Sequence, residues 1–182
     1  MRPTLFAVAG VFVAAVLSGS ALASAPQPAK PVPADLYSGR WYEIARTPNR
    51  RQNDCQGDTV DFSGWSAAGF SVVQTCHKGA PDGPRNSYKA HGAALPASDN
   101  AKMKLSFFGG FITQEYWIVD LADDHAWAIM ATPAGHYVWL LSRHPVLDPE
   151  VQALALSRLR ALGFDTSKLV FDEPPAATAP PA

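Results

Sequence analysis

Short runs in which apolar and polar residues alternate recur along most of the chain, separated by residues that favour turns. In residues 58–63, for example, Val60 and Phe62 fall on one side of an extended backbone and polar residues fall on the other. This period of two is typical of a β-strand with one buried face. The sequence predicts eight strands, at residues 40–47, 58–63, 70–77, 86–94, 102–107, 115–121, 126–131 and 136–143. Their short connections favour antiparallel neighbours, and the first and eighth runs are placed to close the sheet into a β-barrel.

Beyond the eighth run the apolar period changes to that of an α-helix. Asp148 is a candidate N-cap, Pro149 suits the first helical position, and Gly163 suits the position just after the helix. The expected buried face has spacings of three and four residues and comprises Val151, Leu154, Ala155, Leu159 and Leu162. We therefore expect an amphipathic helix on the outside of the barrel, and then a short ninth strand at residues 169–171 that returns to the sheet edge.

The two ends of the chain depart from this pattern. Residues 1–23 combine Arg2, an apolar run at residues 5–17 that is too short to span a bilayer, and an A-x-A signal at residues 21–23. We expect a signal peptide that is cleaved before Ser24, and an uncleaved signal anchor is the alternative. Residues 24–34 and 174–182 are rich in Pro and Ala, which predicts a disordered lead-in and a disordered tail around one domain at residues 35–173.

Charge narrows the classes of partner. The formal net charge is −1, with no strongly basic or acidic block, which argues against a nucleic-acid partner and against electrostatic attachment to a membrane. No cysteine lies near the expected cleavage site, so acylation of a new N-terminal cysteine is not expected. The predicted product is exported and soluble.

Cys55 and Cys76 are the only two cysteines in the sequence. An oxidising compartment favours a disulfide between them. Pairing residues 58–63 with residues 70–77 as a hairpin brings Cys76 opposite residue 56, one position from Cys55, and a bulge at the strand entry would close that gap. Two unpaired buried thiols are the alternative.

Five segments follow one another in a specific order: WYEIAR at 41–46, SFFG at 106–109, YWIV at 116–119, WLLSR at 139–143 and GFDTSK at 163–168. Together they resemble the lipocalin family, and within it the bacterial lipocalins related to apolipoprotein D. The resemblance covers residues 35 to about 171. It implies an eight-stranded up-and-down barrel (the lipocalin or calycin fold) that is closed at one end and holds a lipid-sized cavity.

The resemblance also implies a function. Known bacterial members bind fatty acids and lysophospholipids and are associated with envelope maintenance under stress, so we expect a small hydrophobic or amphipathic lipid as the partner. Such members are usually outer-membrane lipoproteins, and this sequence departs from them because it lacks the acylated cysteine. We therefore expect a periplasmic or secreted protein. Whether it contacts the outer membrane peripherally, and whether it forms a homodimer, stay open.

Three residues carry the structural signature of the family: Gly39, Trp41 and Arg143. The resemblance implies that Trp41 plugs the closed end of the barrel. The Arg143 guanidinium is expected to stack on its indole and to bond to backbone carbonyls. We assign these residues to stability and not to ligand contact.

Side-chain alternation supplies the candidate ligand-binding residues, which are Val60, Phe62, Leu105, Phe107, Tyr116, Ile118, Tyr137 and Trp139. Met130 and Ala128 on the seventh strand are further candidates, but the register of this strand, and so the face that points into the cavity, is uncertain by one position. Alternation places Glu43 on the same face of its strand as Trp41, so it either faces the interior with a polar partner or turns to solvent at a bulge. A barrel filled by its own side chains is the alternative to a cavity.

No catalytic residue, metal site or cofactor is expected. The five histidines form no i, i+4 pair and no His–Cys cluster, and neither Ser106 nor Ser142 lies in a nucleophile elbow. The predicted function is non-covalent lipid binding. Two alternatives stay open: an enzyme on a lipocalin barrel, with isomerase or epoxide chemistry that needs a reactive thiol or an acid–base pair, and a protein-binding module that acts through its loops.

Overall fold

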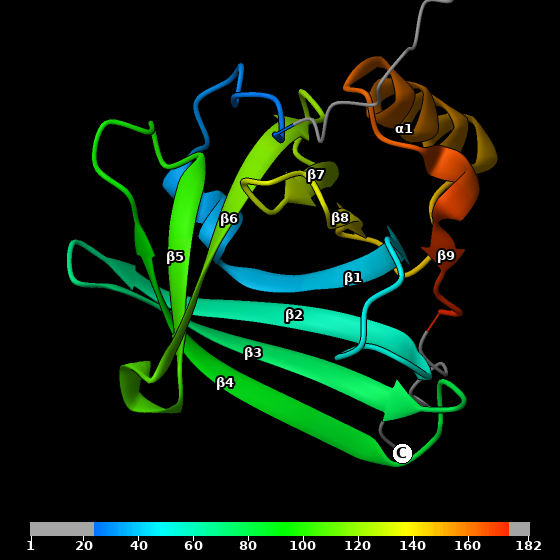
Figure 1. The fold of residues 1–182 in the computed structure, drawn as a ribbon, viewed down its shortest axis with the longest axis horizontal. Helices are drawn as coiled ribbons and strands as arrows, with labels where there is room; N and C mark the ends of the chain where they lie inside the picture. The colour runs from blue at the N-terminus through cyan, green and yellow to red at the C-terminus, as the bar shows by residue number, and fades with distance from the viewer. Residues whose placement is uncertain (1–23, 175–182) are drawn as a thin grey trace, which may run out of the picture.

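Eight antiparallel strands close into one barrel in the computed structural model, which describes residues 24–174 (Figure 1). The strands are β1 (Gly39–Arg46), β2 (Cys55–Ser66), β3 (Gly69–Lys78), β4 (Arg85–Ala94), β5 (Lys102–Phe107), β6 (Ile112–Leu121), β7 (Trp127–Ala131) and β8 (Val138–Ser142). The remaining elements are η1 (Ala34–Tyr37), η2 (Phe108–Gly110), α1 (Pro149–Ala161), η3 (Thr166–Lys168) and β9 (Val170–Phe171). Strands β2 to β8 pair in chain order, and β1 pairs with both β8 and β2. The predicted barrel with its outer helix and ninth strand is confirmed.

The predicted signal peptide and residues 175–182 of the predicted tail lie outside the described residues. Among the residues that are described, no helix is both long and apolar enough to cross a membrane.

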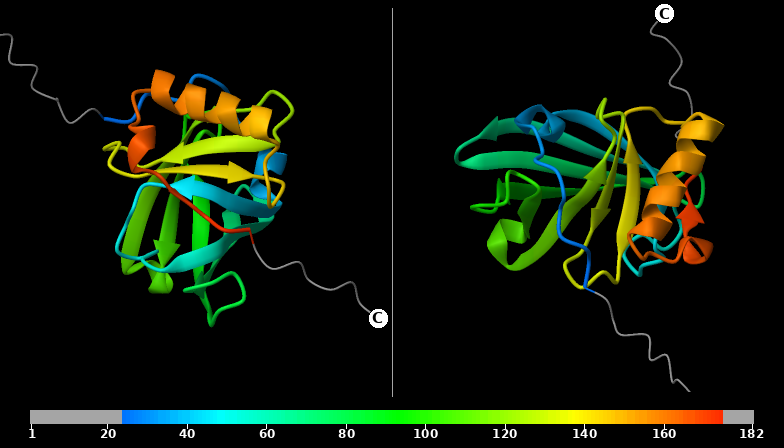
Figure 2. Two further views of the ribbon diagram at one scale, coloured as in Figure 1. Left: turned by 90° about the vertical axis from the view of Figure 1, so that its right-hand side faces the viewer. Right: turned by 90° about the horizontal axis from the view of Figure 1, so that it is seen from above.

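Apolar side chains of the barrel form an inner and an outer layer. On β8, Trp139 and Leu141 belong to the inner layer, and Val138 and Leu140 belong to the outer layer. The outer layer lies beneath α1, which covers the outer face of β7 and β8 (Figure 2). Burial on both faces explains why β7 and β8 are continuous apolar runs, whereas the strands without a covering helix alternate.

Helix α1 begins where the sequence predicts. The Asp148 carboxylate accepts a hydrogen bond of 3.1 Å from the backbone N–H of Glu150 and caps the first turn. Ala155 and Leu159 are fully buried against the barrel, but Leu154, expected on the same face, is 55% exposed. The strip of helix that contacts the barrel is narrower than the apolar stripe, and Leu154 lies beyond its edge.

Residues 24–34 lie against the barrel, which corrects the prediction of a disordered lead-in. The backbone N–H of Ala25 bonds to the Pro133 carbonyl at 2.9 Å, and that of Val32 bonds to the Asp99 carbonyl at 2.8 Å. Ala25 is buried in the outer layer and Val32 in the inner layer. A Pro- and Ala-rich segment is poorly suited to regular pairing, but its extended backbone can still bond to neighbouring loops.

Strand β9 completes the barrel wall. It pairs with the second half of β1, beyond the last residue at which β1 pairs with β2. The chain then bonds to both strands, because the N–H of Asp172 reaches the Ile44 carbonyl at 3.0 Å and the N–H of Gly57 reaches the Glu173 carbonyl at 2.9 Å. The C-terminal segment therefore bridges the place where β1 and β2 separate.

Candidate functional site

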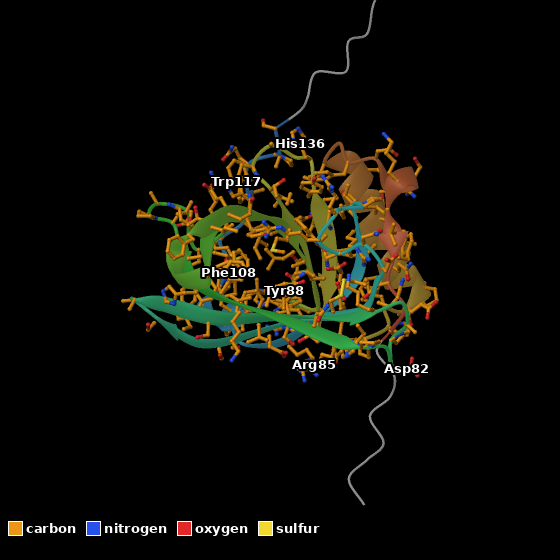
Figure 3. The ribbon with its side chains drawn as sticks, turned by 60° about the horizontal axis from the view of Figure 1, so that its bottom comes forward. Asp82, Arg85, Tyr88, Phe108, Trp117 and His136 are labelled. Carbon is orange, nitrogen blue, oxygen red and sulfur yellow. A yellow bond between two sulfur atoms is a disulfide. The ribbon has the colours of Figure 1, made fainter. Side chains whose placement is uncertain are left out.

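The barrel contains a cavity of about 420 Å³, within the roughly 300–1,000 Å³ usual for small-molecule sites. Its wall is mainly apolar and includes Val60, Phe62, Val72, Met103, Leu105, Phe107, Tyr116, Met130, Trp139 and Leu141. The mouth lies away from Trp41 and is lined by Arg50 and Arg51 of the β1–β2 loop and by Lys78. Tyr88 of β4 and Phe108 of η2 line it from the other side, and Figure 3 shows both over the front of the barrel.

Six of the eight predicted binding residues line this cavity: Val60, Phe62, Leu105, Phe107, Tyr116 and Trp139. Ile118 does not line it. It is buried in the inner layer near the closed end, where its N–H bonds to the Ala101 carbonyl. Tyr137 does not line it either and is 40% exposed. Strand β8 begins only at Val138, so Tyr137 belongs to the preceding turn, where strand alternation does not apply.

Trp41 closes the other end of the barrel. Its indole is buried, and the guanidinium carbon of Arg143 lies 3.9 Å from the ring centroid. The Nη atoms of Arg143 donate at 2.7–3.4 Å to the backbone carbonyls of Asp35, Leu36, Ser38 and Arg40. The predicted stack and its carbonyl bonds are therefore present. Gly39 enters β1 with φ +67°, a left-handed conformation that other residues adopt only with strain.

Glu43 is buried and lines the cavity, which decides between the two orientations left open by the sequence. Its carboxylate accepts a hydrogen bond from Arg46 Nη1 at 2.9 Å. Alternation would place these two residues on opposite faces, but a β-bulge between Glu43 and Ala45 turns Arg46 inward as well. Arg46 also donates to Asp172 at 3.2 Å and to the backbone carbonyls of residues 52 and 55 at 3.0 and 2.9 Å.

Gln52 joins this ion pair to the cavity wall. Its Nε2 donates to Glu43 at 2.7 Å and to Asp58 at 2.8 Å. Its Oε1 accepts from Trp139 Nε1 at 2.9 Å and from Asn49 Nδ2 at 2.8 Å. The full hydrogen-bonding capacity of the amide is thus used, and the β1–β2 loop is fixed at the mouth. This role could not be predicted from the sequence, because a glutamine in a polar loop follows no periodic pattern.

Three carboxyl groups share this buried cluster with one guanidinium. Burial raises the pKa of Glu43 to about 8 and that of Asp58 to about 7, and it also raises the pKa of Asp172. Arg46 alone cannot balance three negative charges in a site with little water. One Asp58 oxygen has no hydrogen-bond partner among the described residues. We therefore expect the cluster to retain at least one proton at neutral pH.

Cys55 and Cys76 form the predicted disulfide. The observed register places His77, and not Cys76, opposite Gln56, so the predicted register is off by one position, and a bulge follows Gln56. The bond ties the start of β2 to the end of β3 beside the mouth of the cavity. Asp58 and the two cysteines are the one cluster of potential metal ligands among the described residues, but both sulfur atoms are taken by the disulfide.

The arrangement of strands, cavity and Trp41–Arg143 stack agrees with a comparison to known families. A family model described as a lipocalin-like domain matches residues 32–174. The protein belongs to the lipocalin family. This lipocalin is 31% identical over 147 residues to the outer membrane lipoprotein Blc of Escherichia coli (strain K12), a match that covers 79% of this chain and 80% of that protein.

Two further relatives are eukaryotic. The lipocalin is 30% identical over 158 residues to temperature-induced lipocalin-1 of Arabidopsis thaliana, with 81% of each chain covered. It is 28% identical over 176 residues to apolipoprotein D of Mus musculus, with 91% of this chain and 90% of that protein covered. The predicted resemblance to bacterial lipocalins related to apolipoprotein D is confirmed.

Solved structures support the fold. Insecticyanin from the tobacco hornworm Manduca sexta matches with a TM-score of 0.67 and 18% identity, over 81% of this chain and 83% of that chain. At that level of identity the match concerns the fold alone. The lipocalin cavity itself combines an apolar wall, the partly buried phenol of Tyr116 and a basic mouth, and burial raises the pKa of that phenol. Such a site can desolvate a hydrocarbon chain and hold a polar group at one end.

Proposed function

We propose that this lipocalin binds an amphipathic lipid, such as a fatty acid or a lysophospholipid, without forming a covalent bond. The observation that carries the proposal is the open cavity with apolar walls, since a barrel filled by its own side chains would leave no room for a ligand. An acyl chain in this cavity would gain about 0.8 kcal/mol for each methylene removed from water. The bacterial relatives that the sequence resembles make a lipid the natural class of ligand.

The mouth favours a lipid with an anionic head group. Arg50, Arg51 and Lys78 line it. Within residues 24–174 neither arginine forms an ion pair, so both guanidinium groups are available to a carboxylate or a phosphate. Glu43 lies deeper, and its raised pKa limits the negative charge that it would place beside the acyl chain at neutral pH.

We propose binding and storage or transport, and not catalysis, as the role of this cavity. Both cysteines are joined in the disulfide, so no free thiol serves as a nucleophile. A disulfide also suits an oxidising compartment, which supports an exported protein in the periplasm or outside the cell. The relative named as an outer membrane lipoprotein supports a role at the cell envelope.

A paired substitution on β5 tests the proposal. Leu105 lines the cavity and Lys104 is exposed on the opposite face of the same strand. Leu105→Trp should lower the affinity for a fluorescent fatty acid by about tenfold or more, because the indole occupies space that the acyl chain needs. Lys104→Trp should leave the affinity unchanged. Equal affinities in the two variants, or no binding by the native protein, would contradict lipid binding in the cavity.

A further inference from the structure

The turn between β5 and β6 exposes a cluster of large apolar side chains. Phe111 is 92% exposed, Phe108 is 64% exposed and Ile112 is 39% exposed. A single exposed apolar residue is ordinary, but three within five consecutive positions form a patch of the kind that marks an interaction surface. We call residues 108–112 the apolar turn.

The backbone projects the apolar turn away from the barrel. Phe108 has φ +50°, and Gly109 and Gly110 follow with φ +70° and +99°. A bulky residue rarely adopts positive φ, so this conformation is held at a steric cost that often accompanies function. A Cβ atom added to either glycine would meet no atom within 4 Å, which shows that open space surrounds the tip.

The apolar turn borders the mouth of the cavity. Phe108 lines the cavity together with Tyr88, which is 41% exposed on β4 (Figure 3). Pairing between β4 and β5 extends only as far as Ala90 opposite Phe107, so the first half of β4 has no neighbour on that side. The barrel wall is therefore open beside the turn, and a surface that covers the turn also faces the cavity.

Several basic residues lie on this side of the molecule, although the whole chain has a formal net charge of −1. Arg85 and Lys89 are exposed on β4, and Lys104 is exposed on β5, where it stands opposite Glu115 of β6. Arg50 and Arg51 add two guanidinium groups at the mouth. Net charge describes the whole chain, so it does not describe the local charge beside the turn, which is mainly positive.

We propose that the apolar turn inserts into the interface of a bilayer that contains anionic phospholipid, and so places the cavity mouth against the membrane. Exposed aromatic rings next to basic side chains suit the boundary between acyl chains and charged head groups. A protein partner would need an apolar pocket and acidic residues at fixed positions to match this surface, whereas an anionic bilayer presents apolar chains and negative charge together. The apolar turn is an external surface, so its insertion does not depend on whether the cavity contains a lipid.

A fluorescent label tests insertion directly. Both native cysteines are in the disulfide, so Phe111→Cys supplies the single free thiol for an environment-sensitive dye. Vesicles of phosphatidylethanolamine and phosphatidylglycerol should shift its emission to the blue, and added salt should weaken the response by screening the charges. The matched control is Val146→Cys, which is 64% exposed between β8 and α1 and should show no shift.

Unlabelled variants test how much Phe111 contributes to the affinity for vesicles. Phe111→Ser should lower the fraction that sediments with these vesicles by about tenfold, and Val146→Ser should leave it unchanged. Phe111 does not line the cavity, so Phe111→Ser should bind a fluorescent fatty acid normally in the absence of vesicles. That second assay separates failure of membrane docking from failure of lipid binding.

Three results would overturn the proposal. The first is a native protein that does not sediment with the vesicles. The second is equal sedimentation of Phe111→Ser and Val146→Ser. The third is a blue shift of the Phe111→Cys label that depends on protein concentration and not on vesicles, which would mean that a second copy of the chain covers the turn.

Discussion

The indole nitrogen of Trp139 donates a hydrogen bond of 2.9 Å to the amide oxygen of Gln52, which lies 87 residues earlier in the chain. The bond connects β8 to the loop between β1 and β2 and places Gln52 at the centre of the buried polar cluster. Loop residues thereby gain a fixed position beside the cavity wall. The cluster holds the mouth in shape, and the apolar wall remains free for a ligand.

Gln52→Ala should destabilise the protein. The change removes hydrogen-bond partners from Glu43, Asp58 and Trp139, all of which are buried. Leaving buried polar groups without partners costs roughly 1–3 kcal/mol each, and we expect about 2–4 kcal/mol in total because water can enter at the mouth. Denaturant unfolding measures the change. Asn53→Ala, one position along the same loop and exposed, should cost less than about 0.5 kcal/mol, and an equal cost for both variants would refute the role of Gln52.

Arg143→Ala should weaken folding more than lipid binding. The variant loses the stack on Trp41 and four hydrogen bonds to backbone carbonyls, all at the closed end and away from the cavity. We expect a loss of about 2–4 kcal/mol in the free energy of unfolding, with little change in affinity where the variant is folded. Arg40→Ala is the control, because Arg40 forms a surface ion pair with Asp61 that should contribute about 0–1 kcal/mol. An unchanged melting temperature together with lost binding would overturn the structural assignment.

Stability should fall as the pH rises through the range in which the buried cluster loses protons. Burial raises the pKa of Glu43 from an ordinary 4.5 to about 8, so the folded chain binds this proton more tightly than the unfolded chain does. That contribution is complete below about pH 4.5 and is lost as the pH rises through about 8. Asp58, with its pKa raised to about 7, acts in the same direction, and Asp172 and Arg46 are the other charged groups that face the pair.

Glu43→Gln isolates this effect, because glutamine keeps the shape of the side chain but cannot ionise. Between about pH 5 and pH 8 the melting temperature of the native protein should fall more than that of the variant. Glu150→Gln, in the exposed first turn of α1, is the control and should follow the native protein. Parallel curves for the native protein and Glu43→Gln would show that the buried carboxyl does not titrate in this range.

Reduction of the disulfide should lower the melting temperature. Cys55 and Cys76 are 21 residues apart in sequence. A crosslink over that distance lowers the conformational entropy of the unfolded chain, which stabilises the fold by about 3 kcal/mol. The double variant Cys55→Ser with Cys76→Ser should show the same loss, and reductant should then have no further effect. A native melting curve that is indifferent to reductant would contradict this expectation.

Regular strand geometry explains which parts of the site could be predicted from the sequence. Alternation with a period of two placed Phe62, Leu105 and Tyr116 correctly, because each lies within a continuous strand. It failed for Tyr137, which precedes its strand, and it could not settle Glu43, since the bulge beside it depends on the pairing of β1 with β8. A bulge is a tertiary feature, and a single sequence carries little trace of it.

The loop contacts could not be predicted from the sequence for a different reason. Gln52 and the docked segment at residues 24–34 have no periodic pattern, and their composition resembles that of mobile loops. Their order comes from hydrogen bonds to residues far away in the chain, such as Trp139 for Gln52 and Asp99 for Val32. Exposure of Phe111 was equally hidden, because an apolar residue in a sequence is expected to be buried until the fold shows otherwise.

Native mass spectrometry of the protein purified from its own cell envelope, followed by lipid extraction, tests lipid binding in the cavity most directly. The native chain should carry one amphipathic lipid, and Leu105→Trp, purified in the same way, should carry none or much less. Recovery of no lipid from the native protein, together with no displacement of a fluorescent fatty acid by added lipids, would contradict the proposal that this lipocalin is a lipid carrier.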